Sequence, residues 1–210
     1  MLLTDNKPEI KNKKRKTIPK ALIYEMRKGK PIYYMDYKRV IAGEKTLEEV
    51  MGSSKLQAWI IEVIINFLFN AINRNKYKIL FNEIGFQWDV RTWRNLDIAI
   101  FDKNKLLQEG INDKYAKTPP EIVIEIDTKA DLSKYDGLLD LYMREKTQDL
   151  LDSGVKKVVW YTTKDKKVMY AQQNKSWLID NWDFDIELMD KVVLNLGKLL
   201  KEEGVELKGK

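Results

Sequence analysis

The chain has 210 residues, of which 44% are hydrophobic and 33% charged, a composition typical of a globular protein with one well-buried domain. It contains neither cysteine nor histidine, which excludes disulfides, thiol nucleophiles, zinc–thiolate sites and histidine-based catalytic triads. A metal site would therefore need oxygen ligands, and these favour Mg²⁺, Mn²⁺ or Ca²⁺. The net charge of +6, from 38 basic and 32 acidic residues, suits a polyanionic partner.

The first twenty residues are rich in lysine and poor in apolar side chains. We expect a flexible basic arm over residues 1–20, followed by a single domain over residues 21–210. The arm would either contact phosphate groups without sequence preference or only keep the protein soluble. No apolar signal sequence is present, and the most apolar run, residues 58–72, is interrupted by polar side chains and too short to span a bilayer. We therefore expect a cytoplasmic protein.

Hydrophobic periodicity and capping residues divide the remaining chain into helices and strands. Residues 21–41 are mixed and aromatic, which indicates a hairpin or an irregular lead-in. Thr46, with Glu49 three residues later, has the spacing of a capping box. The predicted elements in chain order are a short helix ending at Gly52, a long helix over 55–73, strands over 77–81, 84–90 and 96–101 with a turn at 82–83, a polar excursion over 102–118, a strand over 121–127, a helix over 138–152, a hairpin of strands 155–162 and 167–171, an edge strand at 177–179 and a final helix over 190–203.

Three charged residues lie where the local pattern calls for apolar ones. Asp97 falls in the segment 96–101 and Glu125 in the segment 122–127, and both segments are short and apolar on both faces, as in strands covered on each side. Lys146 lies on an apolar helical stripe. Because burying an unpaired charge is costly, such groups tend to be paired, bound to a metal or engaged in chemistry. Two acids on neighbouring strands and one lysine are the minimal set for metal-assisted phosphodiester cleavage.

Alternation along the strand puts Asp127 on the same side as Glu125, so that it could share the pocket.

The three charged residues also have purely structural interpretations. Asp97 could instead begin a strand and bond Arg94 or a turn. Glu125 and Lys146 could form a buried structural salt bridge.

Three other polar residues are candidates for the same region. Lys129 is a rival lysine four residues beyond Glu125, but it follows the strand and is expected in solvent. Gln57 and Glu62 could reach the pocket from the long helix. The polar stripe that contains Glu62 is, however, expected to face solvent.

These residues resemble a known pattern. An acidic residue followed by a strand bearing (D/E)-x-K is typical of the PD-(D/E)XK nuclease superfamily, although Asp127 stands here where the lysine normally stands. The chain is similar to one branch, the Uma-type restriction endonuclease family, with R-x-P-D, then apolar-E-V, then a helical K-x7-G-V before a Y-W-like strand. The matching segments are Arg94-Asn95-Leu96-Asp97, Ile124-Glu125-Ile126, and Lys146 separated by seven residues from Gly154-Val155.

The resemblance covers about residues 21–200. The spacing of Glu25 and Gly29 and the segment 52–57 also look like features of the family. Three positions depart from it: Leu96 replaces the proline, Gln57 stands where many members carry histidine, and residues 158–160 replace the Tyr-Trp pair.

The resemblance implies an α/β (α+β) fold with a restriction-endonuclease-like core, in which a central mixed β-sheet is flanked by helices. It also implies a divalent-metal-dependent DNA endonuclease. Asp97 and Glu125 would bind one Mg²⁺ or Mn²⁺, with the backbone carbonyl of Ile126 as a third ligand. Lys146 would contact the attacking water or the scissile phosphate, and Asp127 would assist the metal or pair with Lys146.

DNA is the expected partner, and a homodimer would let two sites address two strands. Two other classes of function compete with this one. The first is a catalytically weak or inactive nuclease fold that acts as a DNA-binding or regulatory module. The second is an assembly protein whose tyrosine- and tryptophan-bearing surface pairs subunits.

Overall fold

The computed structural model describes residues 17–205, so most of the predicted basic arm lies outside the described residues. The strands are β1 (Ile23–Arg27), β2 (Lys30–Tyr33), β3 (Tyr77–Asp89), β4 (Thr92–Asp102), β5 (Ile122–Ile126), β6 (Lys157–Thr162), β7 (Lys167–Gln172), β8 (Leu178–Asn181), β9 (Ile186–Met189) and β10 (Val192–Leu194). The helices are α1 (Tyr37–Ile41), α2 (Leu47–Met51), α3 (Lys55–Ala71), α4 (Lys103–Glu109), α5 (Leu139–Asp152) and α6 (Leu196–Glu202), with 3-10 turns η1 (Lys20–Leu22) and η2 (Leu132–Tyr135).

Strand β4 organises the main sheet, whose order is β2-β1-β4-β5-β6-β7-β8 with β3 paired to β4. β3 runs antiparallel along the length of β4. β1 and β5 pair with β4 at two different places, β1 near Trp93 and β5 at Ile98–Ile100. β5 and β6 are parallel, and the other pairs are antiparallel. The sheet is therefore mixed, as predicted, and β1 and β5 pair with successive stretches of the same strand, β4.

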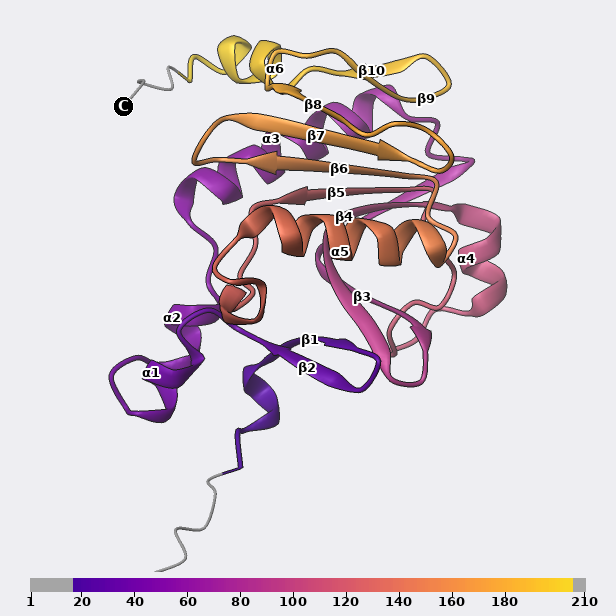
Figure 1. The fold of residues 1–210 in the computed structure, drawn as a ribbon. Helices are drawn as coiled ribbons and strands as arrows, with labels where there is room; N and C mark the ends of the chain where they lie inside the picture. Colours follow the sequence, from indigo (N-terminus) through magenta and orange to yellow (C-terminus); the bar gives the residue numbers. More distant parts are fainter. Residues whose placement is uncertain (1–16, 206–210) are drawn as a thin grey trace, which may run out of the picture.

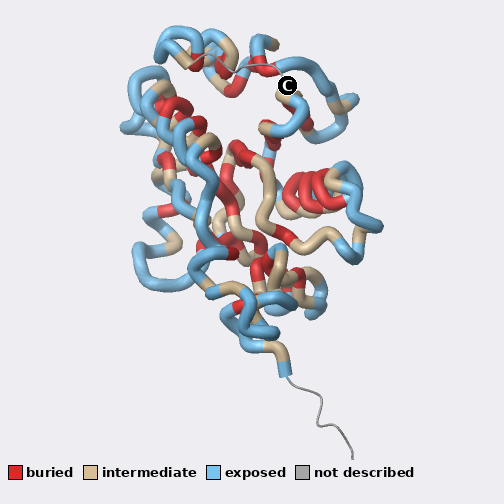
Figure 2. The backbone as a smooth tube through the Cα atoms, turned by 90° about the vertical axis from the view of Figure 1, so that its left-hand side faces the viewer, coloured by how far each residue is buried: buried red, intermediate tan, exposed pale blue. Residues whose placement is uncertain are grey.

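Helices cover both faces of this sheet (Figure 1). α5 crosses one face and packs on a core that includes Val123 and Trp160. α3 and α6 cover the other face, where the core includes Ile124 and Tyr161. The burial pattern in Figure 2 follows this arrangement, with buried residues along the central strands and α5. Because alternate residues of β5 face opposite cores, Glu125 lies on the same side as Val123, toward α5.

Helices α2 and α3 begin where the sequence indicated. Thr46 and Glu49 form the expected capping box, with the Glu49 carboxylate accepting from the Thr46 N–H at 2.6 Å. Ser54 caps α3. The polar residues of this helix, Glu62, Asn66 and Asn70, are exposed as expected. The segment 21–41 contains the β1–β2 hairpin and α1. Among the described residues, no helix is long and apolar enough to cross a membrane.

Three parts of the chain differ from the prediction. The two strands predicted at 77–81 and 84–90 form one strand, β3, because Asn82 and Glu83 make a bulge rather than a turn. The polar excursion contains α4, capped by the Asp102 carboxylate. The β9–β10 hairpin occupies the start of the predicted last helix, and Asn195 caps the shorter α6.

Candidate active site

The two predicted acids lie side by side. β4 and β5 pair Ile98 with Ile124, and one further step in this register sets Asp97 opposite Glu125. The N–H of Ile126 donates to Asp97 Oδ2 at 2.8 Å, which fixes the Asp97 carboxylate against β5. Asp97 is 7% exposed and Glu125 1%. The structure thus brings together two buried carboxylates from neighbouring strands.

Lys146 reaches this pair from α5. Its Nζ lies 3.0 Å from Glu125 Oε1, 2.9 Å from Glu25 Oε1 and 2.7 Å from the Asn95 carbonyl oxygen. The Lys146 side chain is fully buried. The contact with Glu125 is the ion pair that the sequence offered as the alternative to a catalytic lysine.

Glu25 is a member of the cluster that sequence reasoning did not select as a site residue. It lies in β1, and its Oε2 accepts from Arg94 Nη1 at 2.7 Å and from the Tyr142 hydroxyl at 2.8 Å. Arg94 is also buried and donates to Asp149 at 2.6 Å. It therefore does not bond Asp97, as the structural interpretation of Asp97 proposed. The available signal was an acid within the otherwise apolar start of a strand, the same signal that selected Asp97.

Burial and neighbouring charges shift the pKa values of these groups in different directions. Burial raises the pKa of Asp97 to about 6 and raises the pKa of Glu125 well above its usual range. Burial also acts to raise the pKa of Glu25, but Lys146 and Arg94 together hold that pKa below its usual value. Burial alone would lower the pKa of Lys146, yet the negative charges of Glu125 and Glu25 raise it, so that Lys146 is an ammonium.

Asp127 does not join the cluster as predicted. It follows the last residue of β5 with φ of 55°, so the alternation that would have placed it beside Glu125 has ended. Its carboxylate accepts from the Thr163 N–H at 2.8 Å and the Thr163 hydroxyl at 2.6 Å. The expectation that Asp127 pairs with Lys146 is corrected: in the structure, Asp127 ties the end of β5 to the residue after β6.

Of the three remaining candidates, Gln57 reaches the site, Glu62 does not, and Lys129 is more buried than expected. Gln57, at the start of α3, is buried and donates from Nε2 to the Ile126 carbonyl at 2.8 Å. Glu62 is exposed on the outer side of α3. Lys129 is not in solvent as expected: its side chain is 12% exposed and forms an ion pair with Glu83.

The donor set fits a divalent cation of the Mg²⁺ type. Asp97, Glu125 and the Ile126 carbonyl offer only oxygen atoms, and Mg²⁺ is commonly bound by one or two carboxylates together with waters and substrate phosphate. Glu125 Oε1 lies 3.0 Å from the Lys146 ammonium, without the alignment of a hydrogen bond. Within residues 17–205, no group of three or more acidic side chains is placed to hold a metal ion.

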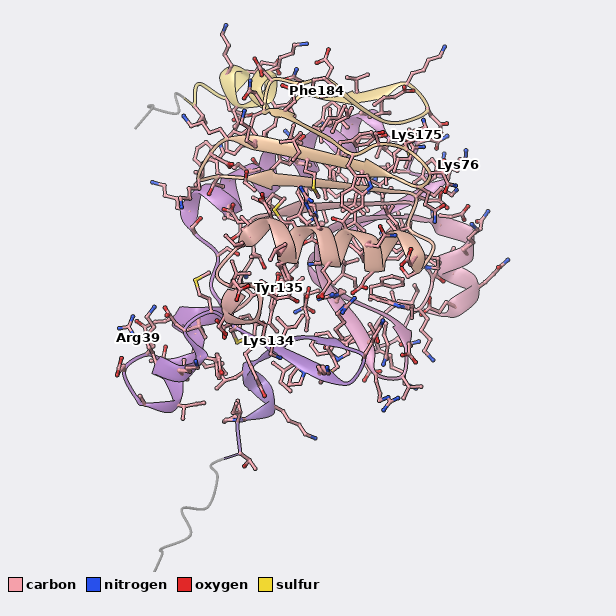
Figure 3. All side chains as sticks on the ribbon, in the orientation of Figure 1. Arg39, Lys76, Lys134, Tyr135, Lys175 and Phe184 are labelled. Atoms are coloured by element: carbon pink, nitrogen blue, oxygen red, sulfur yellow. The ribbon has the colours of Figure 1, made fainter. Side chains whose placement is uncertain are left out.

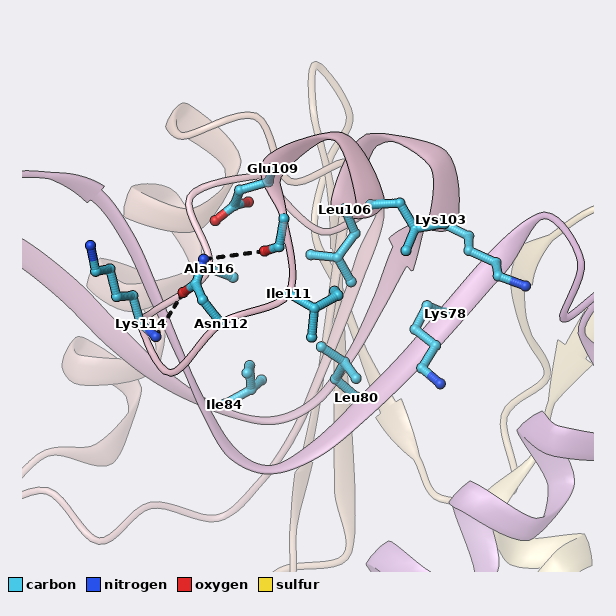
Figure 4. Close-up of a pocket in the computed structure, with 12 residues that line it drawn as sticks. Lys78, Leu80, Ile84, Lys103, Leu106, Glu109, Ile111, Asn112, Lys114 and Ala116 are labelled. Carbon is cyan, nitrogen blue, oxygen red and sulfur yellow. Dashed lines mark hydrogen bonds between the residues drawn. The ribbon is translucent and has the colours of Figure 1, made fainter.

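Other surface features lie away from these acids. η2 bridges the hairpin and α5, since Lys134 donates to the Pro31 carbonyl at 2.6 Å and the Tyr135 hydroxyl to Glu145 at 2.6 Å (Figure 3). An open pocket lies between α4, the loop after it and β3 (Figure 4). Its walls are mainly apolar, with Leu106 and Ile111 inside and Lys103 at the rim, and it shares no lining residue with the acidic cluster. The buried carboxylates, rather than the mainly apolar pocket, are therefore the candidate active site.

Comparison with known proteins supports the fold. No family model matches the sequence, and no curated protein matches it. A solved structure described as "a putative nuclease belonging to DUF820" from Anabaena variabilis matches with a TM-score of 0.60 and 12% sequence identity, covering 84% of this chain and 89% of that chain. At this identity the likeness concerns the fold, and it confirms the predicted mixed α/β architecture. The chain therefore has the restriction-endonuclease-like fold that the PD-(D/E)XK pattern predicted.

Proposed function

We propose that the protein is a divalent-metal-dependent DNA endonuclease that hydrolyses phosphodiester bonds. The observation that carries this proposal is the pair of buried carboxylates, Asp97 and Glu125, facing each other on β4 and β5. Two carboxylates in such surroundings are unfavourable when both are ionised, because burial raises the pKa of each. A divalent cation between them would remove that penalty.

Each residue has a part that follows from its contacts. Asp97, Glu125 and the Ile126 carbonyl would hold Mg²⁺ or Mn²⁺, and the bound ion would activate water and neutralise charge on the phosphate. Gln57 orients the Ile126 peptide through its side-chain amide. Lys146 positions Glu125 by holding it at 3.0 Å.

The choice of DNA rests on the fold and on charge. A solved structure with this fold is described as "a putative nuclease", and the net charge of +6 favours a polyanionic ligand. A homodimer is part of this proposal, because two copies of the site would cut both strands of a duplex.

The test is nicking of supercoiled plasmid with Mg²⁺ or Mn²⁺ and with a chelator. Asp97→Asn and Glu125→Gln keep the side-chain shapes but remove the charges, and both should abolish metal-dependent nicking. Asp180→Asn, at an exposed position of β8, is the matched control and should cut like the wild type. Equal nicking by all four proteins, or nicking that persists in the chelator, would refute the proposal.

A second candidate is a DNA-binding module without turnover. It is favoured by the complete burial of Lys146, which leaves that ammonium no path to a substrate phosphate. This candidate predicts DNA binding that weakens steeply with salt and no product with either metal. Metal-dependent nicking that Asp97→Asn abolishes would exclude it.

A further inference from the structure

The β3 bulge lies directly beside Asp97. Phe81 pairs with Ile98 and Ile84 with Leu96, so that Asn82 and Glu83 both stand opposite Asp97. Both bulge residues have left-handed backbone conformations, with φ of 76° and 54°. Such conformations are costly for residues other than glycine and persist where the surroundings enforce them. Bulges commonly re-aim a side chain next to a functional site, and Glu83 is one of the two residues of this bulge.

Lys129 meets Glu83 from the segment that follows β5. The two side chains form an ion pair, with Lys129 12% and Glu83 25% exposed. The Lys129 backbone is anchored, because its carbonyl accepts from the Met35 N–H at 2.6 Å. Glu83 stands opposite Asp97 in the β3–β4 register, so the ion pair of Lys129 with Glu83 lies beside Asp97. Both side chains are therefore within electrostatic range of Asp97.

The two lysines near the acids differ in what they can still bind. The Lys146 ammonium has three donors and contacts three oxygen atoms, on Glu25, Glu125 and Asn95, and it is fully enclosed. For Lys129, the only carboxylate within ion-pair distance among residues 17–205 is Glu83. It also keeps some exposure to solvent. An arriving phosphate could thus engage Lys129 by displacing one carboxylate, whereas Lys146 would first have to abandon both buried acids.

We propose that Lys129 is the lysine that contacts the scissile phosphate, and that Glu83 holds its ammonium in place until nucleic acid binds. The ligand is a phosphodiester of the nucleic-acid backbone, so this assignment rests on the proposed function. Lys146 is then a positioning residue that fixes Glu25 and Glu125. The exchange involves no covalent step, since Lys129 changes partner from the Glu83 carboxylate to a phosphate oxygen.

The experiment is a double-mutant cycle on DNA affinity. A short fluorescein-labelled duplex is titrated by anisotropy in buffer with Ca²⁺, over a series of salt concentrations, with wild type, Lys129→Met, Glu83→Gln and the double variant. Lys129→Met should weaken binding roughly tenfold, as expected for loss of a charge-assisted contact, and should reduce the salt slope by about 0.9. Glu83→Gln should tighten binding in the wild type but not in the Lys129→Met background, because Glu83 acts through Lys129.

Lys156→Met is the matched control, because Lys156 also pairs with a glutamate, Glu121, but precedes β6 at the opposite end of β5. It should leave affinity and salt slope unchanged. Thermal melts of all variants exclude unfolding as the cause. An unchanged affinity for Lys129→Met, or equal tightening by Glu83→Gln in both backgrounds, would overturn the assignment. Wild type that binds DNA but never cuts it with Mn²⁺ would end the nuclease proposal, while the cycle would still decide the role of Lys129. Wild type that fails to bind DNA at low salt would overturn both.

Discussion

Glu25 and Glu125 are two buried glutamates that contact the same ammonium, that of Lys146, at 2.9 and 3.0 Å. Glu25 has further donors, since Arg94 and the Tyr142 hydroxyl both bond its Oε2. Glu125 has Lys146 alone among charged partners in the described chain. The pKa of Glu25 is accordingly lowered despite burial, whereas burial raises the pKa of Glu125.

This difference separates a structural end of the cluster from a reactive end. Around Glu25 every charge has a partner, and the network joins β1, β4 and α5. Around Glu125 and Asp97 the negative charges exceed the donors that neutralise them. A buried carboxylate that is short of donors is where a cation binds with the largest gain. Four predictions test this division, from the largest expected effect to the smallest.

Lys146→Met should be the most destabilising change, because it leaves two buried carboxylates without their shared ammonium. We expect a loss of about 3–5 kcal/mol in the free energy of unfolding, as for other broken buried ion pairs, measured by urea denaturation at pH 7. Adding Glu125→Gln should recover part of this loss, because Lys146 is the charged partner of Glu125. Lys156→Met, which removes a largely exposed lysine, should have a much smaller effect. A fully stable Lys146→Met protein would contradict the division of the cluster into a structural end and a reactive end.

Asp97→Asn should stabilise the protein at high pH. The folded-state pKa of Asp97, about 6, is above its usual value of 3.8, so its contribution to stability is present below pH 3.8 and is lost as the pH rises through 6. The neutral amide avoids that loss, which corresponds to about 3 kcal/mol at 1.36 kcal/mol for each pKa unit. Urea denaturation at pH 4 and pH 8 measures the difference.

The gain from Asp97→Asn should be much smaller at pH 4 than at pH 8, and Asp180→Asn should show none at either pH. Mg²⁺ should stabilise the wild type at pH 8 but not Asp97→Asn. A gain of equal size at both pH values would show that the Asp97 charge is not its source.

Tyr142→Phe tests the structural end of the cluster, around Glu25. It removes the hydroxyl that donates to Glu25 at 2.8 Å and should lower the free energy of unfolding by about 2 kcal/mol, as for hydrogen bonds to charged groups. Because the folded-state pKa of Glu25 is lowered, the ionised carboxylate stabilises the fold above its unfolded-state pKa. The effect of Tyr142→Phe should therefore shrink as the pH falls through the folded-state pKa. A loss that does not change with pH would mean that the hydroxyl acts through packing alone.

Asp127→Asn should have the smallest effect, about 1 kcal/mol from weakened bonds to Thr163. Asparagine tolerates the left-handed backbone at this position, so strain does not add to the loss. Thr163→Val should lose a similar amount, and the two changes together should fall short of additivity because they remove one shared contact. Full additivity in urea denaturation would show that the two residues act separately.

The parts of the site that lie on short apolar strands were predictable from the sequence. β-branched runs marked β4 and β5, and alternation placed Glu125 toward the helix that carries Lys146. Those inferences needed only local patterns and a pairing of strands that are near neighbours in the chain.

The remaining parts depend on features that leave no local pattern. Glu25 reaches the cluster only because β1 pairs with β4, a contact between distant segments. Glu83 and Lys129 meet because two residues other than glycine adopt left-handed conformations in β3. Asp127 does not follow the alternation of side chains along β5, because β5 ends one residue before it.

The peptide groups of Ile126 connect three elements without using its side chain. Its N–H binds Asp97 of β4, and its carbonyl binds Gln57 of α3. Such a junction is indifferent to which apolar residue occupies the position, so Ile126→Val should preserve both bonds. The three elements can therefore stay joined while the apolar residue at this position changes. The match at 12% identity likewise shows one fold formed by two largely different sequences.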